Sequence, residues 1–387
     1  MNQLKQKIRY GMVGGGEGAF IGAVHRHAAA LDGQYQLVAG AFSRDAANNA
    51  RTGEQLGLSA SQIYSDWATL LSAQAALPAA ERMQLLVIVT PNHTHVPISI
   101  AALQAGFHVF SEKPAGVSLA ETQQLAQVAA TQQRLYGLAH TYLGYPLVWQ
   151  ARSMVAQGYL GRLRKIFVEY PQGWLTDDLE ASAHKQASWR TDPAQAGSSG
   201  CMADIGTHAF GMAEFISQQQ ITALCAQLYS HVPGRRLDDD GAALFQTDGG
   251  ASGVLMASQV CAGEENALKI RLYGDQGALE WQQMEPNSLI YRPHGAPMQT
   301  YRAGQGQPGL VPEALRRCRL PGGHPEGYLE AMANLYTDFA AAIRAGAHGT
   351  PAGVPGMAAA LRGMAFIETM SASQHSEQKW LPLAASH

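Results

Sequence analysis

The sequence predicts an α/β protein of two domains, with a doubly wound parallel sheet in the first and a large, mostly antiparallel sheet in the second. Before about residue 145, short apolar segments alternate with Ala/Gln/Leu-rich segments at helical spacing, which is typical of a parallel sheet covered on both faces. After it, strand-like stretches follow one another across glycine turns, as in an antiparallel sheet. We therefore expect domains at 1–145 and 146–387.

The first domain is expected to contain five strands joined by helices. The strands are 8–14, 35–43, 85–91, 107–114 and 135–142. The helices are 23–31, 45–56, 96–105 and 119–132. Strands that alternate with helices in this way indicate repeated strand–helix–strand units.

The second domain is expected to contain mostly strands. These are 163–175, 221–232, 242–250, 251–263, 267–275 and 277–283. Helices fit near 203–219, 326–345 and 355–372. The segment 293–325 is rich in Pro, Gly and Arg, and we expect it to be irregular.

Composition excludes several classes of function. The 387 residues carry a net charge of -3 without a long run of one sign, which argues against a nucleic-acid surface or a basic membrane patch. The four cysteines are widely spaced without a Cys-x-x-Cys pair, as suits a reducing cytosol. The sequence also lacks a signal peptide and an apolar stretch of the roughly 18 residues that cross a bilayer. We expect a cytoplasmic protein without nucleic-acid or membrane partners.

Residues 11–22, GMVGGGEGAFIG, lie between the first expected strand and helix. Small residues there let the turn be tight and let backbone N–H groups approach a pyrophosphate. Gly14 and Gly16 have the spacing of a dinucleotide-binding loop, but Gly22 follows Gly16 by six residues. Either Ala19 takes the third small position, or the loop carries an insertion before Gly22. The context predicts a Rossmann dinucleotide-binding domain, with a structural glycine turn as the alternative.

The end of the second expected strand bears on the choice of dinucleotide. The chain reads Phe42-Ser43-Arg44-Asp45 there, where the adenosine ribose is bound about 20 residues after the last glycine. An acidic residue would bind the 2′-hydroxyl of NAD, whereas Ser43 and Arg44 suit the 2′-phosphate of NADP. We expect NAD(P), with a preference for NADP. The alternative is that Arg44 is solvated and Asp45 only caps the next helix.

Lys113 is a candidate for chemistry because of its place at the end of a buried strand. Ligands of an open parallel sheet bind at the carboxyl ends of its strands, and SEKP (111–114) ends the fourth one. A lysine there can hold an alcohol oxygen and favour its loss of a proton. The alternative is a surface lysine at a strand end.

Asp204 and His208 form the second candidate pair. They are four residues apart in GCMADIGTHAFGMAEFI (200–216), so on a helix they share one face. A histidine beside a carboxylate is a proton acceptor near pH 7. The alternative is a first-turn carboxylate and an unrelated histidine.

A metal site is not expected. His93 and His95 are two residues apart in TPNHTH, but no His-Glu-x-x-His or paired-cysteine pattern occurs. Since TPNHTH follows the buried third strand, we expect it to line the cofactor crevice.

These features resemble the Gfo/Idh/MocA oxidoreductases, a family that includes glucose–fructose oxidoreductase and inositol dehydrogenase. The resemblance covers nearly the whole chain, and EKP together with D-x-x-x-H is more specific than either motif alone. The elements that carry it are the glycine loop with Ile21-Gly22 and His25, VTPNHTH (89–95), EKP (112–114), GYLGRLRKIFV (158–168), SWR (188–190) and GSSGCMADIGTH (197–208).

The resemblance implies roles for the candidate residues. Lys113, Asp204 and His208 match the family's catalytic lysine, aspartate and histidine, of which the histidine takes the hydroxyl proton while hydride moves to the nicotinamide. The expected cofactor-binding residues are Gly14, Gly16, Ala19, Phe20, Ile21, Ser43, Arg44, Thr90, Pro91, Asn92, His95, Glu112, Lys113, Trp189 and Arg190. The expected substrate contacts are Lys113, Tyr142, Tyr145, Asp204 and His208.

Two departures from the family pattern affect these expectations. The glycine loop is longer than usual, which leaves its phosphate contacts open. Many members carry an arginine shortly before Tyr-Pro, where this chain has Leu143-Gly144. Substrate contacts there cannot be copied, and Tyr142 and Tyr145 have core packing as their alternative.

We therefore expect an NAD(P)-dependent dehydrogenase that acts on a secondary alcohol of a sugar, anhydrosugar or cyclic polyol. By resemblance, the antiparallel sheet implies a homodimer or homotetramer. One rival is an NAD-dependent glycosidase that oxidises its sugar transiently. The other is a non-catalytic nucleotide sensor, against which the intact set of Lys113, Asp204 and His208 argues.

Overall fold

The computed structural model describes residues 6–182 and 184–383, and the chain divides into two compact units. Unit 1 comprises the residues up to Gly116, Ala120–Ala139 and Met332–Ala360. Unit 2 comprises Val117–Leu119, His140–Ala331 and the residues from Leu361 onward. This division differs from the predicted boundary at 145 because residues 140–145 belong to unit 2 and residues 332–360 return to unit 1.

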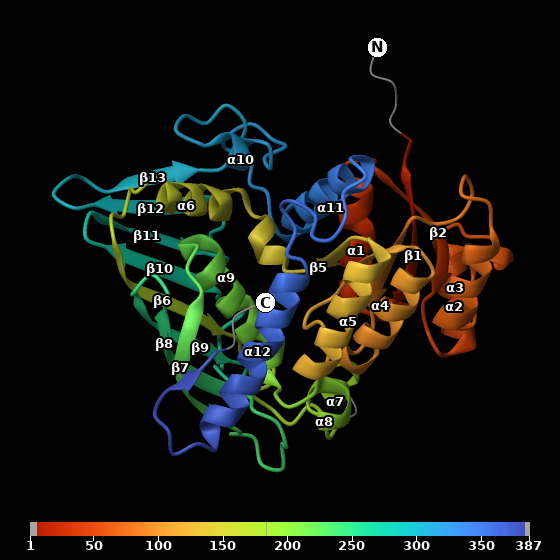
Figure 1. Ribbon diagram of the computed structural model, residues 1–387, viewed down its shortest axis with the longest axis horizontal. Helices are drawn as coiled ribbons and strands as arrows, with labels where there is room; N and C mark the ends of the chain where they lie inside the picture. The colour runs from red at the N-terminus through yellow and green to blue at the C-terminus, as the bar shows by residue number, and fades with distance from the viewer. Residues whose placement is uncertain (1–5, 183, 384–387) are drawn as a thin grey trace. The chain divides into compact units, whose positions relative to one another are not determined.

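Unit 1 contains a five-stranded sheet in the order β2-β1-β3-β4-β5 (Figure 1). Its strands are β1 (Ile8–Gly14), β2 (Tyr35–Ala41), β3 (Leu85–Val89), β4 (His108–Ser111) and β5 (Tyr136–Leu138). Each neighbouring pair runs parallel, which confirms the predicted doubly wound sheet. β3 is buried along its whole length, as a central parallel strand is when helices cover both faces.

Helices cover the sheet of unit 1 on both faces (Figure 1). They are α1 (Phe20–Leu31), α2 (Ala46–Gln55), α3 (Trp67–Ala76), α4 (His95–Gln104), α5 (Leu119–Gln132) and the short turns η1 (Ala60–Gln62) and η2 (Asn92–Thr94). The chain passes from β1 to β2 in one direction and from β3 to β5 in the other, so right-handed crossovers place α1 opposite α4 and α5.

The returning segment 332–360 completes the face that α1 covers. It includes most of α11 (Tyr328–Arg344). The Tyr336 ring lies 5.8 Å from the His25 ring and 4.9 Å from the Phe110 ring. A Cβ on Gly137 would meet the Phe339 ring at 2.6 Å, so glycine in β5 lets this helix approach the sheet.

Unit 2 is built on a nine-stranded sheet in the order β13-β12-β11-β10-β6-β9-β8-β7-β14. Its strands are β6 (Leu163–Pro171), β7 (Ile221–Tyr229), β8 (Asp240–Thr247), β9 (Ser252–Ser258), β10 (Lys269–Gly274), β11 (Gly277–Gln282), β12 (Ser288–Pro293), β13 (Gln299–Arg302) and β14 (Leu381–Pro382). β6 and β9 run parallel, and the other neighbouring pairs run antiparallel. The predicted large, mostly antiparallel sheet is confirmed.

Helices pack on one face of this sheet, and Figure 1 shows α6 and α9 in front of its strands. The helical segments of unit 2 are η3 (Thr141–Gly144), α6 (Pro146–Ala156), α7 (Lys185–Arg190), α8 (Pro193–Ala196), η4 (Met202–Gly206), α9 (Thr207–Ser217), α10 (Pro312–Leu315) and α12 (Met357–Gln374) from residue 361. Phe210 of α9 stacks on Phe366 of α12 at 4.6 Å, and Arg362 pairs with Glu214.

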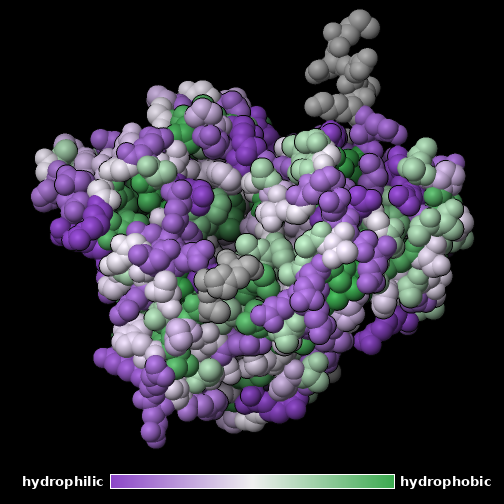
Figure 2. Space-filling model, viewed as in Figure 1, coloured by the Kyte–Doolittle hydropathy of each residue, from purple (hydrophilic) through white to green (hydrophobic). Residues whose placement is uncertain are grey.

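Hydrophilic and apolar residues are interspersed on the side that Figure 2 shows.

The opposite face of the sheet carries apolar side chains that are only partly buried. On β8, Ala243 and Phe245 point into the core, whereas Leu244 between them is 46% exposed. Val254 pairs with Leu244 on one side and with Phe167 on the other. Val254 and Phe167 are half-buried. Strand β9 thus presents apolar side chains to both faces of the sheet.

Several elements were not predicted. α3, α6 and β12 lie in stretches without a clear periodic pattern. The expectation that 293–325 is irregular is wrong for β13 and α10. Tertiary hydrogen bonding supplies what local propensity lacks there, since β13 pairs with β12.

Among the residues that the structure describes, no helix combines the length and apolar composition needed to cross a bilayer.

Candidate active site

The predicted site residues divide between the two units. Lys113 and the expected cofactor residues from Gly14 to Glu112 belong to unit 1. Trp189, Arg190, Asp204 and His208 belong to unit 2, as do the two tyrosines that were expected to contact substrate. The approach of Lys113 to Asp204 and His208 stays a prediction.

The glycine loop is an extended form of the dinucleotide-binding turn. Gly14 and Gly15 have positive φ angles of 84° and 75°. A Cβ on Gly14 would lie 2.7 Å from the Val89 carbonyl oxygen, and a Cβ on Gly22 would lie 2.3 Å from the Gly15 Cα. Gly22 is therefore the small residue that lets α1 approach the loop, and the insertion precedes it. Ala19 is instead the N-cap residue of α1.

The start of α1 fits a phosphate group. Ala19 provides no side-chain cap, so the first backbone N–H groups of the helix can bind an anion. Phe20 is 70% exposed at this end. The Gly16 N–H donates to the Phe42 carbonyl (3.1 Å). Gly16 therefore fixes the shape of the loop. A Cβ on Gly16 would meet the Asn48 side chain at 2.4 Å.

The residues after β2 place an exposed arginine beside a capped helix start. Asp45 caps α2 because its carboxylate accepts from the Asn48 N–H (2.6 Å), and the Ser43 hydroxyl accepts from the Asp45 N–H (3.1 Å). Arg44 is exposed, and it pairs with no residue that the structure describes. Its guanidinium is thus available to a ligand, while the nearby carboxylate is engaged.

The segment after β3 is held by a buried histidine. The His95 ring nitrogens lie 2.7 Å from the Thr90 carbonyl oxygen and 2.8 Å from the Pro114 carbonyl oxygen. Burial lowers the pKa of His95, against the effect of these two carbonyls, so the neutral ring donates one hydrogen bond. Thr94 also ties back to Thr90 (2.6 Å). His95 thus connects the ends of β3 and β4, and its expected contact with cofactor stays a prediction.

A buried chain of polar groups supports Lys113. The Tyr336 hydroxyl lies 2.7 Å from His25 Nδ1, and His25 Nε2 lies 3.0 Å from Glu112 Oε1. Glu112 Oε2 accepts from the Lys113 N–H (3.1 Å). Burial by itself would raise the pKa of Glu112, but the hydrogen bond and charge of His25, helped by Lys113, outweigh burial and lower that pKa. The half-buried Lys113 therefore follows an ionised, anchored residue.

In unit 2, Asp204 and His208 lie where a π-helical turn passes into an α-helix. Asp204 belongs to the π-helical turn η4, and His208 is in the first turn of α9. The assumption of one regular α-helix is therefore wrong for Asp204. π-Turns inserted before α-helices are frequent at functional sites, and no pattern in the sequence indicates this one.

The Asp204 carboxylate is held by two side chains from other elements. Its Oδ2 accepts from Arg190 Nε (3.1 Å) and from Gln259 Nε2 (2.9 Å). The Arg190 guanidinium lies over the Trp189 ring at 4.2 Å. The structure thus gives Arg190 a partner in Asp204, whereas the sequence suggested a cofactor contact. Gln259 was missed, because a glutamine after a strand carries no recognisable signal.

His208 lies in an aromatic and polar environment. Its ring contacts those of Tyr142 and His140, with centroids 4.8 Å and 5.3 Å away. The hydroxyls of Tyr142 and Tyr170 are 2.5 Å apart, and Tyr170 donates to Asn266 Oδ1 (2.5 Å).

Asn266 closes this network by donating from its Nδ2 to the Tyr142 hydroxyl (3.0 Å). With Asn266 donating to Tyr142 and accepting from Tyr170, the remaining hydrogen bond runs from Tyr142 to Tyr170. Burial raises the pKa of Tyr170 well above its usual value, so the Tyr170 hydroxyl keeps its proton. Tyr170 and Asn266 were not predicted.

The two expected substrate tyrosines have different surroundings. Tyr142 belongs to the network beside His208, whereas Tyr145 is buried and packs against Trp281 at 5.4 Å. Burial raises the pKa of Tyr145. The structure favours the alternative reading of Tyr145 as a core aromatic residue.

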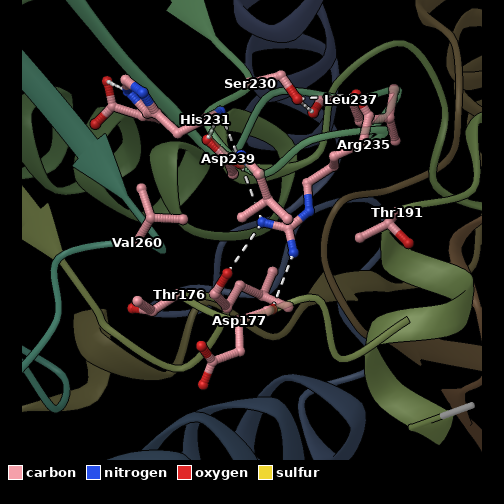
Figure 3. Close-up of polar contacts among 12 residues, drawn as sticks. Thr176, Asp177, Thr191, Ser230, His231, Arg235, Leu237, Asp239 and Val260 are labelled. Atoms are coloured by element: carbon pink, nitrogen blue, oxygen red, sulfur yellow. Dashed lines mark hydrogen bonds and ion pairs between the residues drawn. The ribbon is translucent and has the colours of Figure 1, made fainter. Parts of the chain in front are cut away.

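Unit 2 also contains a hollow of about 630 Å³. It is lined by the ends of β8 and β9 and by neighbouring loops, including Thr176, Asp177, His231 and Val260 (Figure 3). His231 and Asp240 both line it, and His231 Nε2 lies 3.7 Å from Asp240 Oδ2. Its lining residues differ from the predicted site residues.

Comparisons with known proteins cover most of the chain. Residues 8–140 match the family described as an oxidoreductase family with an NAD-binding Rossmann fold, and residues 148–280 match the GFO/IDH/MocA C-terminal domain. An uncharacterized oxidoreductase of Bacillus subtilis, YfiI, is 34% identical over 345 residues, which are 88% of this chain and 87% of that protein. Levoglucosan dehydrogenase of Pseudarthrobacter phenanthrenivorans is 26% identical over 71% of this chain and 73% of its own.

A similar solved structure is that of an inositol dehydrogenase homolog from Azotobacter vinelandii. It has a TM-score of 0.92 and 35% identity, and the match covers 98% of both chains. That structure is complexed with NAD+, and another of the same homolog contains NADH and myo-inositol.

We expect the Glu112 carboxylate to stabilise the fold at neutral pH. Its folded-state pKa is lowered, so its contribution is present above the ordinary value and is lost as pH falls through the folded-state value. Glu112→Gln should lower the free energy of unfolding by about 1.5 to 3 kcal/mol at pH 7. The deficit should shrink below about pH 4.5, the ordinary value for glutamate.

Urea denaturation of both proteins between pH 7 and pH 3 measures this difference. Glu17→Gln is the matched control, since Glu17 is an exposed glutamate that pairs with Arg51 and should change stability little. A Glu112→Gln deficit that does not depend on pH would show that the charge of Glu112 is unimportant.

Proposed function

Because this chain belongs to the Gfo/Idh/MocA family of oxidoreductases, we propose that it is an NAD(P)-dependent dehydrogenase acting on a secondary alcohol of a sugar, anhydrosugar or cyclic polyol. One observation carries the proposal: the anchored Asp204 carboxylate lies on η4, and His208 lies in the first turn of α9. The names of its relatives, among them inositol and levoglucosan dehydrogenases, support the substrate class.

The cofactor, when bound, supplies the nicotinamide C4 that exchanges hydride with the carbinol carbon. Gly14, Gly15 and the start of α1 would hold its pyrophosphate, and Thr90 and Asn92 after β3 would line its nicotinamide side. In oxidation the substrate loses hydride from carbon and a proton from its hydroxyl, which leaves a carbonyl group. His208 accepts that proton, Lys113 stabilises the oxygen as its negative charge grows, and Asp204 accepts a hydrogen bond from the sugar.

The proposed enzyme also associates through the outer face of the unit 2 sheet. Leu244, Val254 and Phe167 form neighbouring cross-strand pairs on that face, and no helix described in the structure covers it. An antiparallel sheet commonly buries one face only, but apolar side chains on both faces favour a second copy on the outer one. A homodimer or homotetramer follows from this.

A panel of sugars and polyols tests the activity directly. Myo-inositol, levoglucosan and D-xylose are incubated with NAD and with NADP, and the absorbance of the reduced cofactor is followed. Reduction of cofactor with at least one compound supports the proposal. Release of a phenol from an aryl glycoside without net reduction would instead indicate a glycosidase, and cofactor binding without turnover would indicate a sensor.

We expect His208→Ala to lower kcat by at least about 10²-fold, because a general base contributes 10²- to 10⁴-fold. The affinity for cofactor should change little, and wild-type kcat/KM for oxidation should fall at low pH as the base is protonated. His231→Ala is the matched control, since His231 is an exposed histidine of the same unit. If His208→Ala keeps the wild-type turnover and the same acid limb, Lys113 or Tyr142 becomes the leading base.

Arg44→Ala should weaken NADP far more than NAD. A guanidinium pairs with a phosphate through two charge-assisted hydrogen bonds, whereas NAD offers a hydroxyl at that place. Fluorescence titration with both reduced cofactors measures the two affinities, with Arg164→Ala as an exposed control in unit 2. Equal losses for both cofactors, or tighter NAD binding by the wild type, would contradict the preference for NADP.

We expect the wild type to be a dimer or tetramer in sedimentation equilibrium at micromolar concentration. Leu244→Glu should shift it toward monomer, because a carboxylate would be buried in the interface. Met298→Glu is the control, since Met298 is 60% exposed at a distant hairpin. A wild-type monomer would contradict this part of the proposal.

A further inference from the structure

Three segments of unit 2 meet at the Asp204 carboxylate. Asp204 itself lies on η4, Arg190 is the last residue of α7, and Gln259 directly follows β9. Both donors bind the same oxygen, Oδ2, at 3.1 Å and 2.9 Å. The Asp204 and Arg190 side chains are 18% and 25% exposed, so solvent reaches this ion pair only in part.

Arg190 is restrained on several sides. Its Nη1 donates to the Gln186 side-chain oxygen at 2.5 Å, one helical turn earlier. The guanidinium also lies over the rings of Trp189 and Trp174, at 4.2 Å and 6.0 Å. A side chain restrained in this way loses little conformational entropy when it binds a carboxylate.

Gln259 is fixed through its backbone. Its N–H donates to the Asp239 carbonyl (2.8 Å), and its carbonyl accepts from the Leu175 N–H (3.0 Å). The side chain is buried and reaches Asp204. Gln259 therefore connects the strand end on one side with the 173–182 loop on the other.

The buried Arg235 holds that loop and Asp239 together (Figure 3). It binds Glu180 through two nitrogens at 2.7 Å and 2.9 Å, and Asp239 at 3.0 Å. It also donates to the carbonyls of Leu175 (3.0 Å) and Asp177 (3.3 Å). The two residues that flank the Gln259 backbone, Leu175 and Asp239, thus share one guanidinium.

We propose that Arg190 and Gln259 are positioning residues that hold Asp204 as an acceptor-only carboxylate, and that Arg235 maintains the backbone from which Gln259 acts. This inference rests on the proposed function, in which Asp204 binds the substrate. A neighbouring guanidinium favours the charged form of a carboxylate. Asp204 then accepts a hydrogen bond from a substrate hydroxyl, while His208 takes the proton of the reacting hydroxyl.

The inference assigns Arg190 a partner other than the cofactor, and a mutant cycle separates the two roles. Arg190→Gln, Gln259→Leu and Asp204→Asn are made singly, and the first two are also combined with Asp204→Asn. For each protein, kcat and KM are measured with the panel compound of highest kcat/KM, and NADH affinity is measured by fluorescence. Arg236→Gln is the matched control, because Arg236 forms an exposed ion pair with Asp192.

Loss of a hydrogen bond to a charged group should lower kcat/KM by about 10- to 100-fold in Arg190→Gln and in Gln259→Leu. NADH affinity should remain that of the wild type. Either substitution should change kcat/KM little further in the Asp204→Asn background, since residues that act through one group are not additive. Arg190→Lys, which keeps the charge, should recover part of the loss and guards against misfolding of Arg190→Gln.

Other results would overturn the inference. A loss of NADH affinity in Arg190→Gln would make Arg190 a cofactor ligand, as would an undiminished effect of that change in the Asp204→Asn background. Wild-type kcat/KM in Asp204→Asn would overturn the role of Asp204 in the proposed function and the inference with it. Wild-type kcat/KM in Arg190→Gln alongside a damaged Asp204→Asn would overturn the inference only.

The Arg235 part of the inference has its own readout. Arg235→Met removes the guanidinium and keeps most of the side-chain volume, so it should reduce kcat/KM through Gln259. Its effect should therefore be smaller in the Gln259→Leu background than in the wild type. Equal effects in both backgrounds would mean that Arg235 acts on general stability alone.

Discussion

Parallel pairing of β1, β3 and β4 is the constraint on which the cofactor half of the site depends. Val13 pairs with Ile88, and Ile88 pairs with Ser111, so the carboxyl ends of three strands reach one edge of the sheet. Three parts of the candidate site directly follow these strand ends: the glycine loop follows β1, Thr90 follows β3, and Glu112 follows β4. The Glu112 N–H even donates to the Ile88 carbonyl (2.9 Å), which continues the sheet to the residue before Lys113.

Unit 2 places its candidate residues by a different principle, because their side chains come from one face of a sheet and from the helix packed against it. Buried carboxylates and phenols in that position are stable only when their hydrogen bonds are satisfied. The network of Tyr142, Tyr170 and Asn266 does this near His208, and Arg190 with Gln259 does it for Asp204. Groups held by such hydrogen bonds keep their geometry without a ligand.

The sequence was sufficient for the parts that depend on local patterns. Alternating apolar segments predicted both sheets. The glycine loop, EKP and D-x-x-x-H singled out candidate residues, and the resemblance to the Gfo/Idh/MocA family supplied their expected roles. The sequence was insufficient where distant segments meet. Neither the return of Tyr336 to His25 nor the reach of Gln259 to Asp204 leaves a local signal, and a π-turn has no distinct propensity. The glycine pattern left open whether Ala19 or Gly22 is the third small residue of the loop. Only the close approach of Gly22 to the Gly15 backbone decides between them.

The return of residues 332–360 to unit 1 has a consequence for how the protein is made. Residues up to 331 are synthesised before the segment 332–360, which contains Tyr336 and Phe339. Until then, no residue of that segment covers Phe110 and β5. During that time the nascent N-terminal unit exposes an apolar face, and the His25–Glu112 pair lacks its phenol partner. Such intermediates aggregate readily, so this unit cannot complete its fold until residues 332–360 have been synthesised.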